Sequence, residues 1–177
     1  NLAGNVEARD VAVAAAAYRH DLVTGEARWR HAWGKGGAIR MKRMGRLLYV
    51  TAGDSALTAI DLLTGAIVWR VRDRLRFRLA PVVEPDAAFT IAGGITAGAR
   101  AGSTGASGAS RATLHAFDPF SGESRFAVSI GEGPVTVEGL PLVAKETVSV
   151  LVRGRRGLQL HGLCWTSGES RCVSEGG

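Results

Sequence analysis

Residues 57–69 read LTAIDLLTGAIVW, and related segments occur at three other places in the 177-residue chain. These are 17–29, AYRHDLVTGEARW; 114–126, LHAFDPFSGESRF; and 160–172, LHGLCWTSGESRC. An aspartate, a hydroxyl residue, a glycine and an aromatic residue keep one spacing in the first three copies, and the fourth copy is degenerate. Because regular self-similarity is the signature of a repeat architecture, this segment decides the fold.

Each copy has the features of a β-hairpin. Residues 57–61 alternate between two faces of a strand, and the return segment 66–69 is β-branched and aromatic. Gly65 can adopt the positive φ that a tight turn requires. The Asp61 carboxylate is placed to accept hydrogen bonds from the amides of the turn, and Thr64 can add its hydroxyl. We therefore expect an antiparallel hairpin over residues 57–70 with its turn at 62–65.

The repeated residues have a catalytic and a structural interpretation. The aspartates could act as acids or metal ligands, but their constant offset from a glycine indicates that they stabilise turns. The aromatic residues are expected to pack the repeats together before they serve as ligand platforms. No catalytic, cofactor-binding or metal-binding residue is predicted. The predicted structural residues of the repeat are Asp21, Asp61, Asp118, Gly25, Gly65, Gly122, Gly168, Trp29, Trp69 and Phe126.

A second pair of strands is predicted before each of the last three hairpins. Equivalent positions of the four copies are 40, 57 and 46 residues apart. Four antiparallel strands at such intervals are typical of β-propeller blades. The expected fold class is all-β, a β-propeller segment of about three and a half four-stranded blades. The predicted pairs are 38–42 with 46–52, 79–84 with 87–93, and 140–144 with 148–153.

We expect one domain, a partial propeller over residues 1–177. The longest interval contains residues 95–110, ITAGARAGSTGASGAS, which are predicted to form a flexible surface loop. Since propellers close with about four to eight blades, this segment is expected to be a fragment, completed by the same polypeptide or by another chain. The predicted blade ends lie near 11–31, 38–71, 78–129 and 139–173.

The motif A-x-D-x-x-[ST]-G-x-x-x-W, best preserved at residues 59–69, resembles the repeat of pyrroloquinoline-quinone-type (PQQ-like) β-propellers. The resemblance extends from about residue 11 to residue 173. It implies that the repeat aromatics dock between neighbouring blades, which assigns this role to Trp29, Trp69 and Phe126, with Cys172 as a smaller substitute. It also favours the periplasm or the cell envelope as the location.

Proteins with this repeat include quinoprotein alcohol dehydrogenases, scaffolding lipoproteins that resemble BamB, and sensor domains of bacterial serine/threonine kinases. The dehydrogenases use adjacent cysteines and calcium-binding Glu and Asn side chains. This chain has no adjacent cysteines, and its asparagines are Asn1 and Asn5. We therefore expect a non-catalytic binding or scaffolding propeller without a cofactor, the recognition portion of a larger bacterial protein. A fragment of a PQQ-dependent dehydrogenase and a kinase sensor domain are the alternatives.

The chain is basic, with a net charge of +6 and a pI near 10.1. Basic clusters can attract nucleic acids, but aromatic residues make up 6% of the chain and supply few stacking platforms. The alternating stretch 72–78 instead predicts a half-buried strand. A protein partner is favoured over a nucleic acid. No apolar run reaches the roughly 18 residues of a membrane span.

The histidines and cysteines do not form a predicted metal site. His115 and His161 occupy one repeat position, and equivalent positions of adjacent blades are too far apart to share an ion. In the hairpin register of the other copies, Cys164 and Cys172 are three positions apart along the ladder, which favours two thiols. A shifted register would allow a disulfide between them.

Overall fold

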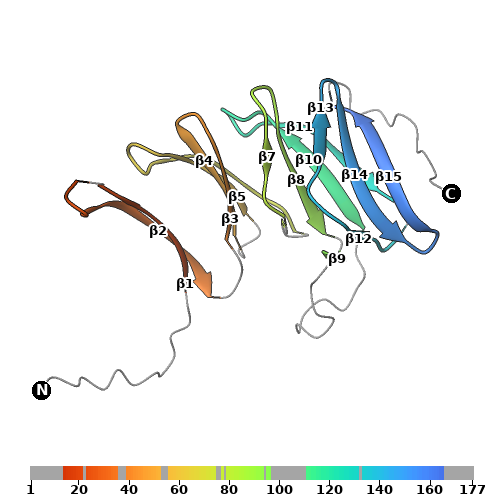
Figure 1. Ribbon diagram of the computed structural model, residues 1–177, viewed down its shortest axis with the longest axis horizontal. Helices are drawn as coiled ribbons and strands as arrows, with labels where there is room; N and C mark the ends of the chain where they lie inside the picture. Colours follow the sequence, from red (N-terminus) through yellow and green to blue (C-terminus); the bar gives the residue numbers. More distant parts are fainter. Residues whose placement is uncertain are drawn as a thin grey trace, which may run out of the picture.

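The computed structural model describes residues 14–21, 23–35, 39–52, 56–74, 77, 79–93, 95–96, 111–131 and 133–165. The regular structure of these residues consists entirely of β-strands, which form four sheets. The sheets stand side by side in a fan from the N-terminal to the C-terminal end (Figure 1). The chain is therefore an all-β segment of a β-propeller, and each sheet is a blade.

In the described part of the chain, the first blade has two antiparallel strands, β1 (Ala14–His20) and β2 (Ala27–Lys35). The second blade contains the complete set of four in the order β3-β4-β5-β6. Its hairpin β5–β6 is the one predicted for residues 57–70. The strands of the second blade are β3 (Arg40–Met44), β4 (Leu47–Ala52), β5 (Ala56–Asp61) and β6 (Ile67–Arg72).

The third blade also has four antiparallel strands, in the order β11-β10-β8-β7. These are β7 (Val82–Val83), β8 (Ala88–Gly93), β10 (Ala112–Phe117) and β11 (Ser124–Ile130). In the fourth blade, two short strands pair one after the other along the same edge of β14. The antiparallel strands of the fourth blade are β12 (Thr136–Val137), β13 (Leu142–Ala144), β14 (Thr147–Gly154) and β15 (Gly157–Cys164).

Two predictions about the connections are wrong. Ile95 and Thr96, assigned to a surface loop, form strand β9, which pairs in parallel with β12 of the next blade. Backbone pairing across blades, which no local pattern reveals, orders these two residues. The rest of the predicted loop lies outside the described residues. The half-buried strand predicted over 72–78 does not run through the described residues of that range, since β6 ends at Arg72, residues 73 and 74 belong to no strand, and Phe77 makes a single bridge to Ala92.

Some predicted boundaries move by a few residues. Arg46, predicted to begin the strand 46–52, lies instead in the turn between β3 and β4 with Gly45, because Gly45 takes the positive φ of 55°. Strand β2 continues to Lys35, beyond the predicted blade end at residue 31, by pairing with Ala14.

The hydrophobic core is divided into clusters that lie between neighbouring blades. Side chains of β4 alternate, so that Val50 packs toward the first blade while Tyr49 packs toward the third. The middle strands β4 and β5 are consequently buried on both faces, whereas in β6 Trp69 is the one buried side chain. Burial between blades is what joins these repeats into one body. Within the residues that the structure describes, no helix has the length and apolar character needed to cross a membrane.

Candidate functional site: the hairpin turns and the groove of the first blade

The turn between β5 and β6 is closed by the Asp61 side chain. Its Oδ1 accepts hydrogen bonds from the Leu63 amide at 2.8 Å and from the Thr64 amide at 2.9 Å. The Thr64 hydroxyl donates to the same oxygen at 3.1 Å. Gly65 has a φ of 74° and donates its amide to the Asp61 carbonyl at 2.8 Å. These are the hydrogen bonds that the sequence predicts for this turn.

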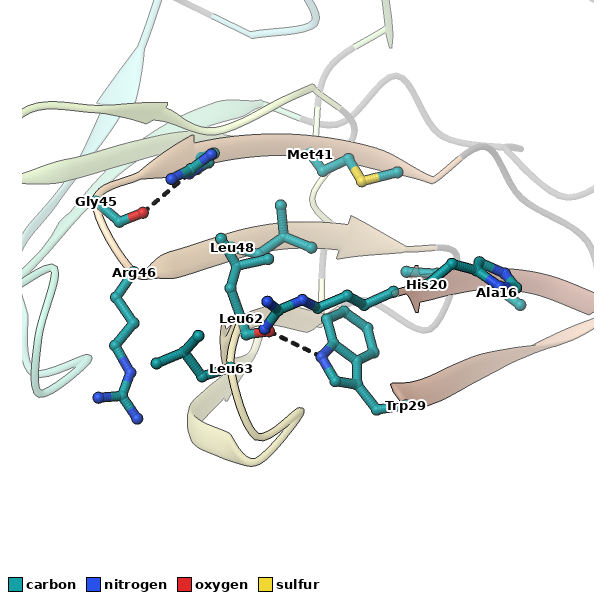
Figure 2. Close-up of a pocket in the computed structure, with 12 residues that line it drawn as sticks. Ala16, His20, Trp29, Met41, Gly45, Arg46, Leu48, Leu62 and Leu63 are labelled. Carbon is teal, nitrogen blue, oxygen red and sulfur yellow. Dashed lines mark hydrogen bonds between the residues drawn. The ribbon is translucent and has the colours of Figure 1, made fainter. Parts of the chain in front are cut away.

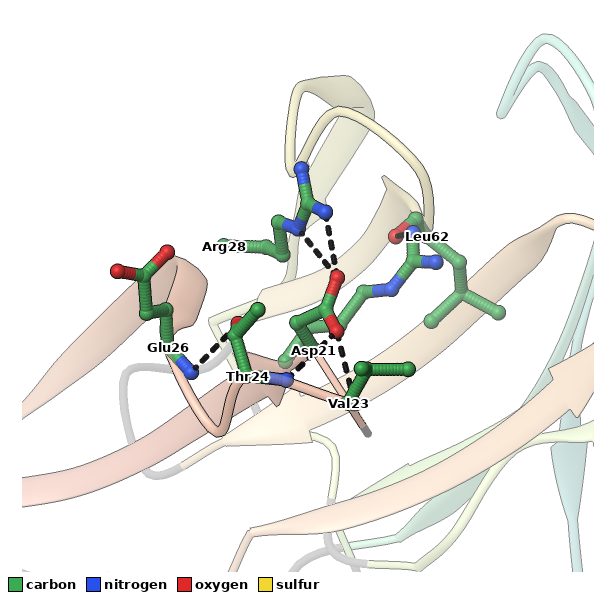
Figure 3. Close-up of polar contacts among 7 residues, drawn as sticks. Asp21, Val23, Thr24, Glu26, Arg28 and Leu62 are labelled. Atoms are coloured by element: carbon green, nitrogen blue, oxygen red, sulfur yellow. Dashed lines mark hydrogen bonds and ion pairs between the residues drawn. The ribbon is translucent and has the colours of Figure 1, made fainter.

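The same arrangement recurs in two other blades. In the first, Asp21 accepts from the amides of Val23 and Thr24 at 2.8 and 3.1 Å (Figure 3). In the third, Asp118 accepts from the amides two and three residues ahead, both at 2.9 Å. The second oxygen of each aspartate forms an ion pair with an arginine. The pairs are Arg28–Asp21, Arg46–Asp61 and Arg125–Asp118.

These contacts lower the pKa of all three aspartates. The Thr64 amide is the main cause for Asp61 and brings its pKa to about 2. The Ser121 amide does the same for Asp118, whose pKa is also about 2. For Asp21 the largest contribution is the hydrogen bond from Arg28. A carboxylate held ionised by its own turn is poorly suited to act as a general acid near neutral pH.

Acid should weaken this protein through these turns. Because the folded pKa of Asp61 and Asp118 is about 2 against an ordinary 3.8, their stabilising contribution is complete above pH 3.8 and is lost as the pH falls toward 2. The measurement is the free energy of unfolding in urea from pH 5 to pH 2. In Asp61→Asn the free energy of unfolding should depend less on pH over this range. An NMR titration midpoint near 3.8 for either carboxyl would contradict the prediction.

The repeat tryptophans dock on the turn of the next blade. Trp29 Nε1 donates to the Leu62 carbonyl at 3.0 Å, and Trp69 Nε1 donates to the Pro119 carbonyl at 2.9 Å. Each indole lies against the glycine of that turn. A Cβ on Gly65 would lie 2.5 Å from Trp29 Cγ, and one on Gly122 would lie 2.6 Å from Trp69 Cδ2. The glycine therefore makes the turn and also leaves room for the indole.

The third aromatic of the repeat, Phe126, is half-buried and packs against the cluster between the third and fourth blades. Gly168, the turn glycine of the fourth repeat, and Cys172, which replaces the aromatic residue there, lie outside the described residues. Cys164 is buried at the end of β15, and its predicted thiol state stays a prediction.

The carbonyl of Pro119, to which Trp69 donates, accepts a second hydrogen bond that was not predicted from the sequence. Tyr49 Oη donates to the Pro119 carbonyl at 2.9 Å, beside the Trp69 indole. Burial is the main cause that raises the pKa of this phenol to about 12. In the preceding interface, Arg19 Nη1 donates to the equivalent Leu62 carbonyl. These two side chains come from different strands, so their shared role appears only in the folded molecule.

A groove of about 720 Å³ opens between the first and second blades. Trp29 and Leu62 converge at one side of it, while Met41 lies on the strand opposite (Figure 2). The groove also contains arginine side chains from both blades. It is lined by Ala16, Ala17, Arg19, His20, Trp29, Met41, Arg43, Gly45, Arg46, Leu48, Leu62 and Leu63.

Three hairpin turns expose an apolar side chain at the same repeat position, two residues after the aspartate. Val23 is 94% exposed, Leu63 57% and Phe120 61%. We call these three residues the turn row. The β-hairpin turns to which they belong project from the same face of the fan (Figure 1). The sequence alone contains this signal, because each of the three repeats that has the aspartate also has an apolar residue at this position.

His115, one of the two histidines at equivalent repeat positions, lies among aromatic rings. His115 stacks on Phe117 and meets Phe77 edge to face, with ring centroids 5.8 and 5.6 Å away. Burial lowers the pKa of His115 and of His161, so both rings tend to be neutral. Within the described ranges, no three His, Cys, Asp or Glu residues are placed to hold a metal ion.

Docked hairpin turns and two-faced cores define this chain as a partial β-propeller whose blades are joined by tryptophan docking. Residues 10–94 match the family model described as "Outer membrane protein assembly factor BamB". The repeats are PQQ-like β-propeller repeats, as the motif predicted. No curated protein sequence matches the chain.

Solved structures with the same fold include dehydrogenases and designed proteins. A europium-containing methanol dehydrogenase is 13% identical with a TM-score of 0.64, and the match covers 89% of this chain and 38% of that one. The quinohemoprotein alcohol dehydrogenase from Comamonas testosteroni is 15% identical with a TM-score of 0.60, covering 90% and 32%. The computationally designed Ika4 protein is 14% identical with a TM-score of 0.58, covering 81% and 76%. The chain thus spans well under half of each dehydrogenase, and these identities establish the fold alone.

Proposed function

We propose that this chain is a non-catalytic binding or scaffolding segment of a PQQ-like propeller, and that it recognises a protein partner on the face of the turn row. The repeat residues are already engaged inside the scaffold. Asp61 is bound by its own turn and by Arg46, and Trp69 is docked on the third blade. What these turns offer to a partner is therefore their exposed apolar tips.

The turn row is the observation that carries this proposal. A single exposed apolar side chain is ordinary on a protein surface. Exposure at one repeat position in three successive blades gives instead a line of apolar contacts, and such exposed apolar surface is typical of interaction sites. An aspartate–arginine pair lies in the turn region of each of these three blades, which supplies the polar rim that protein interfaces show.

The family comparison supports a protein partner. The matching residues 10–94 include Val23, Leu63 and the whole of the groove lining. The matching family is described as an assembly factor, a description that suggests work on other proteins. We extend this role, contact with other proteins, to this chain as part of the proposal.

Photo-crosslinking can test the proposal. A photoreactive phenylalanine analogue in place of Phe120 or Leu63 should form one discrete adduct with the same protein in the native host. Arg155, which is exposed in the turn between β14 and β15, provides the control position. Phe120→Glu should weaken the Leu63 adduct about tenfold, as loss of an interface anchor does. Equal adducts at Phe120 and Arg155 would contradict the proposal.

The dehydrogenase alternative needs a quinone and a calcium ion. The described residues do not fit that pair, because the repeat aspartates are bound in their own turns and no three His, Cys, Asp or Glu side chains in this part of the chain are grouped for a metal. Titration of the purified chain with the quinone and calcium should give no saturable change in quinone absorbance. Stoichiometric binding would favour the dehydrogenase fragment over the scaffold.

A further inference from the structure

The hairpin turns of the second and third blades differ in charge at one equivalent position. Asp86 of the third blade corresponds to Arg46 of the second, since each lies two residues before the strand partner of the residue that precedes the repeat aspartate. Arg46 forms an ion pair with Asp61, which balances the charge of that turn. Asp86 instead brings a second carboxylate to the equivalent place in the third blade, where the repeat aspartate is Asp118.

The position after the turn glycine shows a second difference in charge. It is Glu123 in the third blade and Ala66 in the second. The Glu123 amide donates to the Ser121 hydroxyl at 3.2 Å, which fixes the backbone at the end of the turn. Its side chain is exposed and has no ion pair within the described part of the chain. In the first blade Glu26 holds this position, and its carboxylate points away from the ion pair of that turn (Figure 3).

Phe120 belongs to the turn that these two carboxylates flank in the order of the sheet. The turn joins β10 to β11; Asp86 precedes β8, the neighbour of β10 on one side, and Glu123 precedes β11 on the other. The Phe120 side chain is 61% exposed. An aromatic ring and carboxylates both attract a lysine or arginine side chain, the ring through its face and the carboxylates through charged hydrogen bonds. Leu63, the corresponding residue of the second blade, has neither an aromatic ring nor an excess of carboxylates beside it.

The carboxylates of the described residues gather at the end of the blades where the turn row lies. Because successive strands of a blade are antiparallel, the turn between its first two strands and the turn between its last two lie at the same end (Figure 1). Eight of the ten described aspartates and glutamates lie in or beside these turns, although the chain has a net charge of +6. The arginines next to the repeat aspartates are engaged in ion pairs. The eight are Asp21, Glu26, Asp61, Glu84, Asp86, Asp118, Glu123 and Glu146.

We propose that the partner of the turn row binds through a basic segment, which places a lysine or arginine side chain on the Phe120 ring and against Asp86 and Glu123. This inference rests on the function proposed above, because it names the chemistry of the partner that the turn row recognises. An apolar side chain of the same segment contacts Leu63, where the charge of the turn is balanced. Matched charges of this kind select the partner and speed its association.

An NMR titration with two matched peptides tests this chemistry. The probe is a short synthetic peptide of leucine, arginine and serine, added to the isotopically labelled chain of 177 residues. The amide signals of Phe120 and Glu123 should shift saturably. A matched peptide with glutamate in place of each arginine should bind about tenfold more weakly, because like charges disfavour an interface. The amide of Leu63, in the turn with balanced charge, should distinguish the two peptides less.

Substitutions in the protein make the test specific. Asp86→Asn combined with Glu123→Gln should weaken binding of the arginine peptide roughly fivefold, because each exposed ion pair contributes modestly. Asp73→Asn combined with Glu138→Gln is the matched control, since it changes the net charge equally and removes the two described carboxylates outside these turns. Asp86→Arg installs the residue type of the second blade and should also weaken binding of the arginine peptide, which provides a second test if the first double variant does not fold.

The outcomes separate this inference from the proposed function. Equal affinity for the two peptides would overturn the inference, as would the absence of a saturable shift at Phe120. If the photo-crosslinked adduct at Phe120 still forms in the native host, the proposed function then stands with a partner that is not basic. Loss of that adduct would overturn the proposed function whichever peptide binds. A shift of the Phe120 signal with protein concentration, in the absence of peptide, would assign this face to a second copy of the chain and would also overturn the inference.

Discussion

Replacing Trp69 by alanine is expected to lower the free energy of unfolding by about 3–5 kcal/mol, the range for removal of a large buried aromatic. The indole is 8% exposed, contacts the rings of Tyr49 and Phe117, and donates to the Pro119 carbonyl at 2.9 Å. Its loss leaves a cavity between two blades and an acceptor with one donor fewer. Urea unfolding followed by circular dichroism measures the change.

Two variants separate packing from hydrogen bonding at this position. Trp69→Phe keeps a ring between the blades but loses the hydrogen-bond donor to the Pro119 carbonyl. The lost hydrogen bond should lower the free energy of unfolding by about 1 kcal/mol, in addition to the effect of the smaller ring. Trp29→Ala should cost less than Trp69→Ala, because Trp29 is half-buried beside the groove. Equal losses for Trp29→Ala and Trp69→Ala would show that burial between the blades does not set the contribution.

Gly122→Ala is expected to lower the free energy of unfolding strongly, because the added methyl group would meet the buried Trp69 indole. The φ of 74° costs a side chain about 1–2 kcal/mol, and forcing a methyl group against a packed neighbour costs a further ~1–3 kcal/mol. The added Cβ would lie 2.6 Å from Trp69 Cδ2, so the indole must move. The measurement is again the free energy of unfolding.

Gly25 provides a matched control for this substitution. Its φ of 73° is the same, yet nothing lies within 4 Å of a Cβ built there. Gly25→Ala should therefore cost only the backbone part, about 1–2 kcal/mol. If Gly25→Ala and Gly122→Ala cost the same, the close approach of Trp69 contributes nothing.

Combining Gly122→Ala with Trp69→Ala isolates the contact between the two residues. Once the indole is absent, the added methyl group has no ring to displace, and the second substitution should cost only its backbone strain. The two effects are then less than additive, as for residues in direct contact. If the losses in the free energy of unfolding are additive, glycine is required at position 122 only for its backbone conformation.

The hairpins could be predicted from the sequence because their stabilising contacts are local. Asp61 bonds amides two and three residues ahead, and Gly65 follows at once with a positive φ. A fixed spacing within one turn records such contacts directly. The same locality explains why the all-β class and the blade repeat could be inferred without any tertiary information.

The two candidate binding surfaces differ in the same way, since one depends on local sequence and the other on the fold. The turn row could have been found from the sequence, since its apolar residues recur at one offset from the aspartates. The groove could not, because its lining residues come from separate strands and turns of two blades. Arg43 and Arg46 are close in the sequence, but only the fold brings Arg19 of the first blade into the same groove.

The turns, the strands that they join and the residue type that docks between blades all follow from the repeat pattern. The place where each residue docks follows from the packing of the blades. Tyr49 reaches the Pro119 carbonyl 70 positions away, and Arg19 reaches the Leu62 carbonyl 43 positions away. The pairing of β9 with the fourth blade is of the same kind. Such contacts join residues that have no constant spacing along the chain, so their geometry comes from the packing of whole blades and leaves no repeat in the sequence.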